Sequence, residues 1–311
     1  MARTSRLYNL GVSVLLCGAA TCVHAQWIDY PTPGMPRTKN GAPNLDAPSP
    51  RTPAGKPDLS GIWYSANVVQ DDAVAFLPRE LLAASMKATA GSPPPAPSPN
   101  DYPCQSHSCI EQEALPVDGL NIGRRLTGMT LPYQAWARQA VIQQLSKFAA
   151  DDPHARCVPP SYPRAYSLPQ HMKIVQTPGL LVMLHEFNAS YRQIFVDGRP
   201  LPADPLPSWN GYSTGRWEKD TLVVETIGFR EGLWLDMIGS PLSAAAHITE
   251  RFQRVSVGTL KVQVTVDDPK AYTKPWTVTL EQHLVPDTEL LDDICVENER
   301  SNRLLVDGVS P

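Results

Sequence analysis

"TLKVQVTVDD", residues 259–268, is the stretch in which the structural period of the chain is easiest to see. Apolar and polar residues alternate along it, with Leu260, Val262, Val264 and Val266 separated by Lys261, Gln263 and Thr265. Successive side chains of a β-strand point to opposite faces, so the apolar line marks the buried face. The stretch therefore predicts a strand with one face on a core, and the same line continues to Asp268 at the rim of the sheet.

Similar strands are expected throughout residues 166–300, separated by turn formers such as Pro178-Gly179 and Asp197-Gly198. The expected strands are residues 171–176, 180–187, 191–198, 211–217, 220–229, 247–255, 259–268 and 276–284. About eight short antiparallel strands in succession form a meander, and closing the meander into a barrel removes its exposed edges. We therefore expect a mainly β protein built around an antiparallel β-barrel.

The region before the barrel, residues 57–165, combines one early strand with helices. Leu59–Tyr64 is short, apolar and bounded by turn residues, which predicts a strand. Residues 78–91 begin with a proline and end at a glycine, and residues 131–153 repeat apolar residues at helical spacing before a proline. We expect these helices to form a cap on the barrel, and residues 301–311 to form a C-terminal tail.

The first 25 residues have the pattern of a cleaved secretory signal. A basic start precedes the apolar stretch Leu10–Ala20, and small residues around Ala25 fit a cleavage site. The mature chain then begins with a proline-rich arm, residues 26–56, whose composition favours extended structure. No later stretch reaches the roughly 18 consecutive apolar residues of a membrane span. We expect a periplasmic or secreted bacterial protein with no membrane insertion after cleavage.

The composition limits the possible partners. The formal net charge is -4 and only 19% of the residues are charged, so no basic face for phosphates is expected and nucleic acid is not an expected partner. The sequence contains no G-x-S-x-G elbow, no H-E-x-x-H, no G-x-x-x-x-G-K-[ST] loop and no dinucleotide-binding glycine fingerprint. We expect a small-molecule ligand and no cofactor. The sequence does not indicate whether the protein is a monomer or an oligomer.

Four cysteines follow the signal, and an even number in an exported protein indicates two disulfides. We favour Cys104 with Cys109 and Cys157 with Cys295. The alternative is a zinc site, because these residues and two histidines offer suitable donors. Its ligands would come from Cys104, His107, Cys109, His154 and Cys157. An oxidising compartment consumes thiolates, and the regular C-x-x-C repeat is missing, so disulfides are the favoured interpretation.

Charged residues fall on strand faces that the pattern places inside the barrel. Glu250 lies between Ile248 and Phe252 on one apolar line, and Arg192 shares a line with Ile194 and Val196. In residues 180–187 both faces are apolar, so the pattern places either Glu186 or His185 inside.

The orientation of Glu225 is left open by the pattern. Glu225 shares a face with Val223 and Ile227, but Leu222 and Val224 share the other face with Thr226. Either face can therefore be the buried one.

A carboxylate among apolar neighbours is costly unless it is paired or protonated. One interpretation is a structural ion pair, in which Glu250 or Glu186 contacts Arg192 or Arg251. The other is a carboxyl group with a raised pKa that transfers protons, with a histidine or tyrosine as its complement. On that interpretation the candidate catalytic residues are Glu250, Glu186, His185 and Tyr212.

Aromatic and polar residues at strand ends and in loops are candidates for ligand binding, because amphipathic rings there can hold an organic molecule. The long connection at residues 230–252 has the length typical of a lid. The alternative is that the rings fill the core and the aspartates cap loops. The candidate ligand-binding residues are Arg192, Trp217, Glu225, Trp234, Asp236, His247, Asp268 and Tyr272.

Five blocks of the sequence resemble a family of exported bacterial proteins of mostly unassigned function. They are "DLSGIW" (58–63), "RQIFVDGR" (192–199), "GYSTGRWEKDTLVVET" (211–226), "HITERF" (247–252) and "VDDPKAYTKPW" (266–276). The resemblance implies a periplasmic setting but no particular reaction or catalytic residue. "GIW" is also similar to the G-x-W at the first strand of lipocalin-like barrels. Lys219 stands where the family favours glycine, which implies a slightly strained turn.

The sequence thus predicts a lipocalin-like or allene-oxide-cyclase-like β-barrel with an N-terminal helical cap. The favoured function is a cofactor-independent enzyme that uses acid–base chemistry, as a lyase, isomerase or hydrolase, on a small oxygenated organic molecule. Two alternatives stay open: a non-catalytic carrier of an apolar or phenolic ligand, and a zinc-binding protein.

Overall fold

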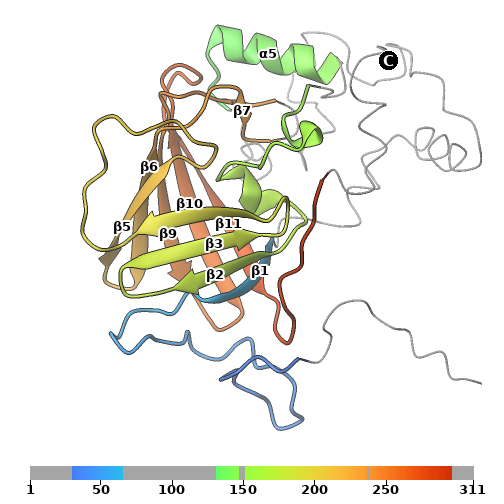
Figure 1. Ribbon diagram of the computed structural model, residues 1–311, viewed down its shortest axis with the longest axis vertical. Helices are drawn as coiled ribbons and strands as arrows, with labels where there is room; N and C mark the ends of the chain where they lie inside the picture. The colour runs from blue at the N-terminus through green and yellow to red at the C-terminus, as the bar shows by residue number, and fades with distance from the viewer. Residues whose placement is uncertain (1–29, 66–130, 147–150, 237–238, 296–311) are drawn as a thin grey trace, which may run out of the picture.

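A closed barrel of nine strands forms the core of the computed structural model, which describes residues 30–65, 131–146, 151–236 and 239–295 (Figure 1). Around the barrel the strands follow the order β1-β11-β10-β9-β6-β5-β4-β3-β2. They are β1 Gly61–Ser65, β2 Met172–Gln176, β3 Leu180–His185, β4 Ser190–Phe195, β5 Tyr212–Glu218, β6 Thr221–Ile227, β9 His247–Arg254, β10 Thr259–Asp267 and β11 Trp276–Leu284. The predicted mainly β barrel is confirmed.

The barrel interior is built from the apolar faces that strand alternation defines. On β10 the four predicted inward residues, Leu260, Val262, Val264 and Val266, are all 0% exposed, whereas Lys261 and Gln263 are exposed. Burying such a face removes apolar surface from water, which is the main favourable contribution to folding. At the β5–β6 turn Lys219 has a φ of 55°, in the left-handed region that favours glycine.

The barrel differs from the predicted meander in two places. β1 comes from the region before the cap and closes the barrel between β2 and β11. In addition, β4 and β5 are parallel, so the barrel is mixed rather than wholly antiparallel. Parallel strands need a connection that returns the chain to the same end, and the proline-rich stretch 199–211, part of the yellow loop in Figure 1, provides it.

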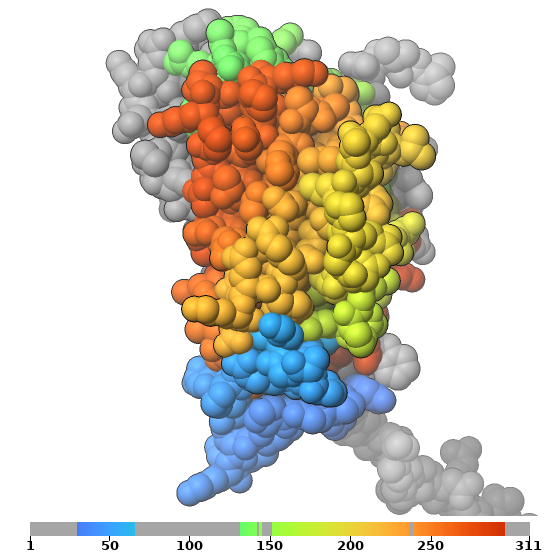
Figure 2. Space-filling view, turned by 90° about the vertical axis from the view of Figure 1, so that its left-hand side faces the viewer, coloured from blue at the N-terminus to red at the C-terminus, as the bar shows by residue number. Residues whose placement is uncertain are grey.

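Both ends of the barrel are covered by other segments. At one end lies helix α5, Ala135–Ser146, whose Ala137 and Val141 are buried. It lies inside the helix predicted at residues 131–153; the helix predicted at 78–91 falls outside the described residues. At the other end lies the described part of the arm, residues 30–56, which is blue in Figure 2.

Several polar contacts fix the arm to the barrel. Arg37 forms an ion pair with Asp287 at 2.5 Å, and Arg51 forms one with Asp220 at 2.7 Å. The backbone amide of Gly258 donates to the Leu45 carbonyl at 2.8 Å. The arm is therefore an ordered part of the barrel's end rather than a free linker.

The long connection between β6 and β9 is packed rather than open. It contains the short strands β7, Leu233–Trp234, and β8, Pro241–Leu242, which pair antiparallel. Leu233, Leu235 and Leu242 are at most 2% exposed. These side chains belong to the apolar core, so the described part of this connection is packed onto the barrel.

A disulfide joins Cys157 to Cys295, which confirms one predicted pair. Cys104 and Cys109 lie outside the described residues. Within the described ranges, no helix has both the length and the apolar character needed to cross a membrane.

Candidate ligand-binding site

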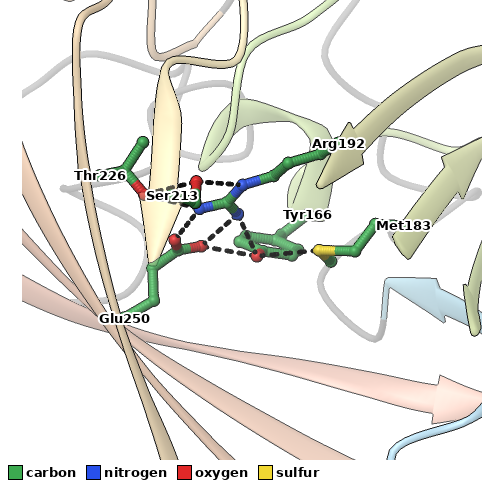
Figure 3. A network of polar contacts seen from close by, with 6 residues as sticks. All are labelled: Tyr166, Met183, Arg192, Ser213, Thr226 and Glu250. Carbon is green, nitrogen blue, oxygen red and sulfur yellow. Dashed lines mark hydrogen bonds and ion pairs between the residues drawn. The ribbon is translucent and has the colours of Figure 1, made fainter. Parts of the chain in front are cut away.

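Glu250 and Arg192 form an ion pair inside the barrel (Figure 3). Glu250 comes from β9, Arg192 from β4, and their side chains are 0% and 1% exposed. The Arg192 NH1 group donates to Glu250 Oε1 at 2.9 Å, and the NH2 group donates to Oε2. Both residues thus face inward as the strand patterns predicted.

Every donor of the Arg192 guanidinium is used in this network, which Figure 3 shows. A guanidinium has five N–H groups, and two of them bond to Glu250. Of the remaining three, Nε donates to Ser213 Oγ at 3.2 Å, NH1 to the Tyr166 hydroxyl at 3.1 Å and NH2 to Thr226 Oγ1 at 2.8 Å. The Tyr166 hydroxyl in turn donates to Glu250 Oε1 at 2.6 Å. No hydrogen of Arg192 is left for a ligand.

Burial and the ion pair act together on the ionisation of this network. Burial lowers the pKa of Arg192, but the charge and hydrogen bond of Glu250, together with Tyr166 and Tyr162, outweigh burial and raise the pKa. Burial, followed by the negative charge of Glu250, raises the pKa of Tyr166 well above its ordinary value. The Tyr162 ring, which lies 4.8 Å from the Arg192 guanidinium carbon, also has a pKa raised by burial. Arg192 therefore stays charged and both tyrosines stay protonated.

A pocket with a volume of about 490 Å³ lies beside this network, at the junction of β4 and β5, and is here called the seam pocket. Only two residue pairs, Ile194 with Ser213 and Phe195 with Thr214, join these strands, which leaves the rest of the junction unpaired. The pocket is lined by Pro159, Asn188, Ala189, Ser190, Tyr191, Arg192, Gln193, Phe195, Ser208, Trp209, Asn210, Gly211, Tyr212 and Ser213. Arg192 and Ser213, which are 2% and 1% exposed, lie deepest.

Aromatic rings dominate the walls of the seam pocket. Phe195 and Tyr212 are stacked, with ring centroids 5.3 Å apart. The Arg199 guanidinium carbon lies 3.9 Å from the Phe195 ring centroid, and its NH1 group donates to the Tyr212 hydroxyl at 3.3 Å. Arg199 is also paired with Asp197 at 2.6 Å. These contacts hold one wall of the pocket in a fixed arrangement.

Trp209 and Asn210, in the connection that precedes β5, also line the pocket. The Arg230 guanidinium carbon lies 4.9 Å from the Trp209 ring centroid. The Asn210 side-chain amide donates to the Tyr191 carbonyl at 2.9 Å. This hydrogen bond satisfies a carbonyl of β4 at a position where β5 does not pair with it. Asn210 Oδ1 is buried and has no hydrogen-bond partner among the described residues.

His185 and Glu186 do not line the seam pocket. Strand alternation places His185 inside, at 2% exposed, where its Nδ1 accepts the Phe187 amide at 3.2 Å. Burial lowers the pKa of His185 to about 4, so its ring is neutral. Glu186 bonds to the ring and the backbone amide of His171. Burial raises the pKa of Glu186, but the hydrogen bonds and charge of His171, together with the Leu291 amide, outweigh burial and lower the pKa. The structure does not bring the four predicted catalytic residues together.

Glu225 and His247 lie on the outer surface of the barrel, not in a pocket. Glu225 is paired with Arg216 at 2.9 Å and lies 3.8 Å from His247. The reason is that the opposite face of β6, with Leu222, Val224 and Thr226, is the one that fills the interior and is 0% exposed. Neither residue is positioned to bind a ligand in the seam pocket.

The remaining predicted ligand-binding residues have structural contacts. Asp236 accepts hydrogen bonds from the Ser240 amide at 3.0 Å and hydroxyl at 2.5 Å, and Asp268 accepts two from Ser243 at 2.7 Å. The Tyr272 hydroxyl donates to the Pro241 carbonyl at 2.9 Å. These are the loop-capping and core-filling roles that the sequence left as the alternative.

Two tryptophans among the predicted residues also have structural contacts. Trp234 pairs with Pro241 in the β7–β8 hairpin, and Trp217 packs against the apolar core. Of all the predicted site residues, the seam pocket contains Arg192 and Tyr212.

Sequence reasoning missed most of the seam pocket and its network. Ser213 carried a usable signal, because strand alternation puts it on the same face as Gly215 and Trp217. Tyr166 lies in the short 3₁₀ helix η3, Arg164–Ser167, and Trp209 lies in the proline-rich connection, where no period applies. The pocket itself results from missing strand pairing, which has no local sequence pattern.

The disulfide removes one of the predicted zinc ligands. Cys157 is bonded to Cys295 and offers no thiolate, while Cys104, His107 and Cys109 lie outside the described residues. Among the residues that the structure does describe, no three His, Cys, Asp or Glu side chains are grouped to hold a metal ion.

A scan against protein-family models finds no match, and a search of curated proteins finds no significant similarity.

Proposed function

We propose that the protein is a non-catalytic binding protein for a small organic molecule, which it holds in the seam pocket. The observation that carries the proposal is the pocket itself, about 490 Å³ in volume, with four aromatic side chains in its lining and two buried polar residues at its back. Pockets for drug-sized ligands typically have volumes of about 300–1,000 Å³ and the same mixture of apolar walls and few polar groups.

Binding is favoured over acid–base catalysis by the chemistry of the lining. A general acid or base has to reach the substrate within hydrogen-bond distance. The described residues that line the seam pocket include no Asp, Glu, His, Lys or Cys, and the hydroxyl of the candidate Tyr212 accepts a hydrogen bond from Arg199 at 3.3 Å. Glu250 lies behind the lining and is occupied by Arg192 and Tyr166. An enzyme using Glu250 would have to break this network in every cycle.

An exported location belongs to the same proposal. It is supported by the signal-like first 25 residues, by the resemblance to exported bacterial proteins and by the Cys157–Cys295 disulfide. Structural disulfides persist in oxidising compartments such as the periplasm.

The binding test is a thermal-shift screen of small organic molecules, followed by titration of each hit and an assay for its chemical conversion. A true ligand raises the melting temperature in a saturable manner. Tyr191→Ala should weaken binding about tenfold, because one aromatic contact of the pocket is lost. Tyr191 is 63% exposed, so the fold should tolerate the change. Tyr30→Ala is the matched control, since Tyr30 is 52% exposed but lies on the arm.

Two results would contradict the proposal. One is unchanged affinity in Tyr191→Ala for every hit. The other is turnover of a hit that Glu250→Gln abolishes while the affinity is kept, which would establish the acid–base enzyme instead.

A further inference from the structure

The hydroxyl groups behind the seam pocket have one proton more than the network uses. Ser213 Oγ and Thr226 Oγ1 each accept from Arg192, and they lie 2.9 Å from one another. One of the two hydroxyls therefore donates to the other, and the second proton has no acceptor in the described part of the chain. Thr226 is 0% exposed, whereas Ser213 lines the pocket. With Thr226 donating to Ser213, the free proton belongs to Ser213 and is available to a ligand.

Arg192 makes Ser213 a stronger donor than an ordinary serine. Ser213 Oγ receives the Arg192 Nε hydrogen at 3.2 Å, and hydrogen bonds arranged in a chain polarise one another in a buried setting. An ionised acceptor forms the stronger bond with such a donor. The deepest point of the pocket thus favours an oxyanion over a neutral or cationic group.

The aromatic walls also disfavour a cation. A ring of aromatic side chains can bind ammonium groups through their faces, but here guanidinium groups already lie over the Phe195 and Trp209 rings. A second cation would be repelled by them and would find no carboxylate in the described lining. Arg230 has no acidic partner among the described residues, which leaves its positive charge available to attract an anion.

The structure assigns an aromatic carboxylate as the ligand class of the seam pocket, an inference that rests on the proposed binding function. One carboxylate oxygen accepts the Ser213 hydroxyl proton. The flat ring lies against the side chains of Tyr191, Phe195, Trp209 and Tyr212, which supply apolar faces for it.

The experiment compares three probes of one shape and different charge by isothermal titration: 2-naphthoate, 2-naphthamide and 2-naphthylmethylammonium. The wild-type protein should bind 2-naphthoate about tenfold more tightly than 2-naphthamide, and the ammonium probe most weakly. Ser213→Ala should weaken 2-naphthoate binding about tenfold, because one charge-assisted hydrogen bond is lost.

A second variant keeps the test independent of the buried network. Arg230→Gln removes a positive charge from the exposed side of Trp209 and should weaken 2-naphthoate binding by about two- to fivefold, with 2-naphthamide unchanged. Lys261→Gln removes the same charge from the outer surface of β10 and should change neither affinity.

The outcomes separate the ligand class from the binding function. Equal affinity for the three probes, lost in Tyr191→Ala, would overturn the carboxylate assignment and leave the pocket in place. If none of the three probes binds but another screened molecule binds in the seam pocket, the carboxylate assignment is also wrong and the binding function is kept. If no molecule binds there, both proposals are wrong.

Discussion

Arg192 and Glu250 lie 58 residues apart in the sequence and meet in an ion pair whose side chains are 1% and 0% exposed. β4 and β9 are not neighbours in the barrel, since β5 and β6 lie between them. The pair therefore joins strands across the interior rather than along the sheet. Tyr166 donates to Glu250, and Ser213 and Thr226 accept from Arg192, so the whole network is a unit of the fold.

Breaking the pair on one side should be costly. Glu250→Leu leaves the Arg192 charge buried without a partner, and the free energy of unfolding should fall by about 3–5 kcal/mol. The double variant Arg192→Met with Glu250→Leu removes both charges and should lose much less. Urea denaturation of the three proteins measures the difference. A single variant as stable as the double one would show that the interior tolerates the unpaired charge.

Gly211, at the edge of the seam pocket, should not accept a side chain. Its φ is 65°, and a Cβ there would lie 2.7 Å from the Ile227 carbonyl oxygen. Gly198 also has a positive φ, 87°, but a Cβ there would meet nothing within 4 Å. Each Gly→Ala variant should lose about 1 kcal/mol of stability, because alanine disfavours a left-handed backbone. The additional loss of stability in Gly211→Ala therefore measures the clash. Equal melting temperatures of Gly211→Ala and Gly198→Ala would show that the side chain at position 211 causes no clash.

The strands were predictable wherever one face is apolar and the other polar. Leu260 to Val266 and the inward position of Glu250 followed from alternation alone, because a half-buried strand shows its buried face in its sequence. On β3 both faces are apolar, and the choice between His185 and Glu186 depended on tertiary packing. The local pattern of apolar residues does not show which of the two faces is buried.

The topology and the pocket were not predictable for a different reason. The pairing of β1 with β11 and the parallel pairing of β4 with β5 join segments far apart in the sequence or separated by a long connection. These pairings depend on long-range geometry. The seam pocket follows from the early end of the β4–β5 pairing, so its aromatic residues could be recognised only once the strands were in place.

The Cys157–Cys295 disulfide should contribute to stability mainly through the unfolded chain. It connects residues 138 positions apart, and a cross-link over a long loop removes much entropy from the unfolded state. The double variant Cys157→Ser with Cys295→Ser should lower the free energy of unfolding by about 2–4 kcal/mol. Denaturation of the wild type with and without reductant provides the control. No difference between the oxidised wild type and the variant would contradict the expectation.

Two buried histidines should make the protein acid-sensitive. Burial, then the positive charge of Arg164, lowers the pKa of His154 to about 4 despite the opposing charge of Asp152, and burial lowers the pKa of His185 to about 4. Both pKa values return to the ordinary value near 6.5 on unfolding. Between these values the unfolded chain binds more protons than the folded one, so stability rises with pH. The contribution is fully present above about pH 6.5 and is lost as the pH falls to about 4, with up to about 3 kcal/mol for each histidine.

His154→Gln isolates this effect from the other titrating groups. The His154 ring is stacked on Phe187, with ring centroids 4.0 Å apart, and a neutral glutamine there takes up no proton. His283→Gln is the control, because the His283 side chain is 56% exposed on the outer surface. The free energy of unfolding, measured by urea at several pH values, should fall less steeply between pH 6.5 and 4 in His154→Gln than in the wild type or the control. Parallel curves for all three proteins would mean that His154 keeps its ordinary pKa in the folded state.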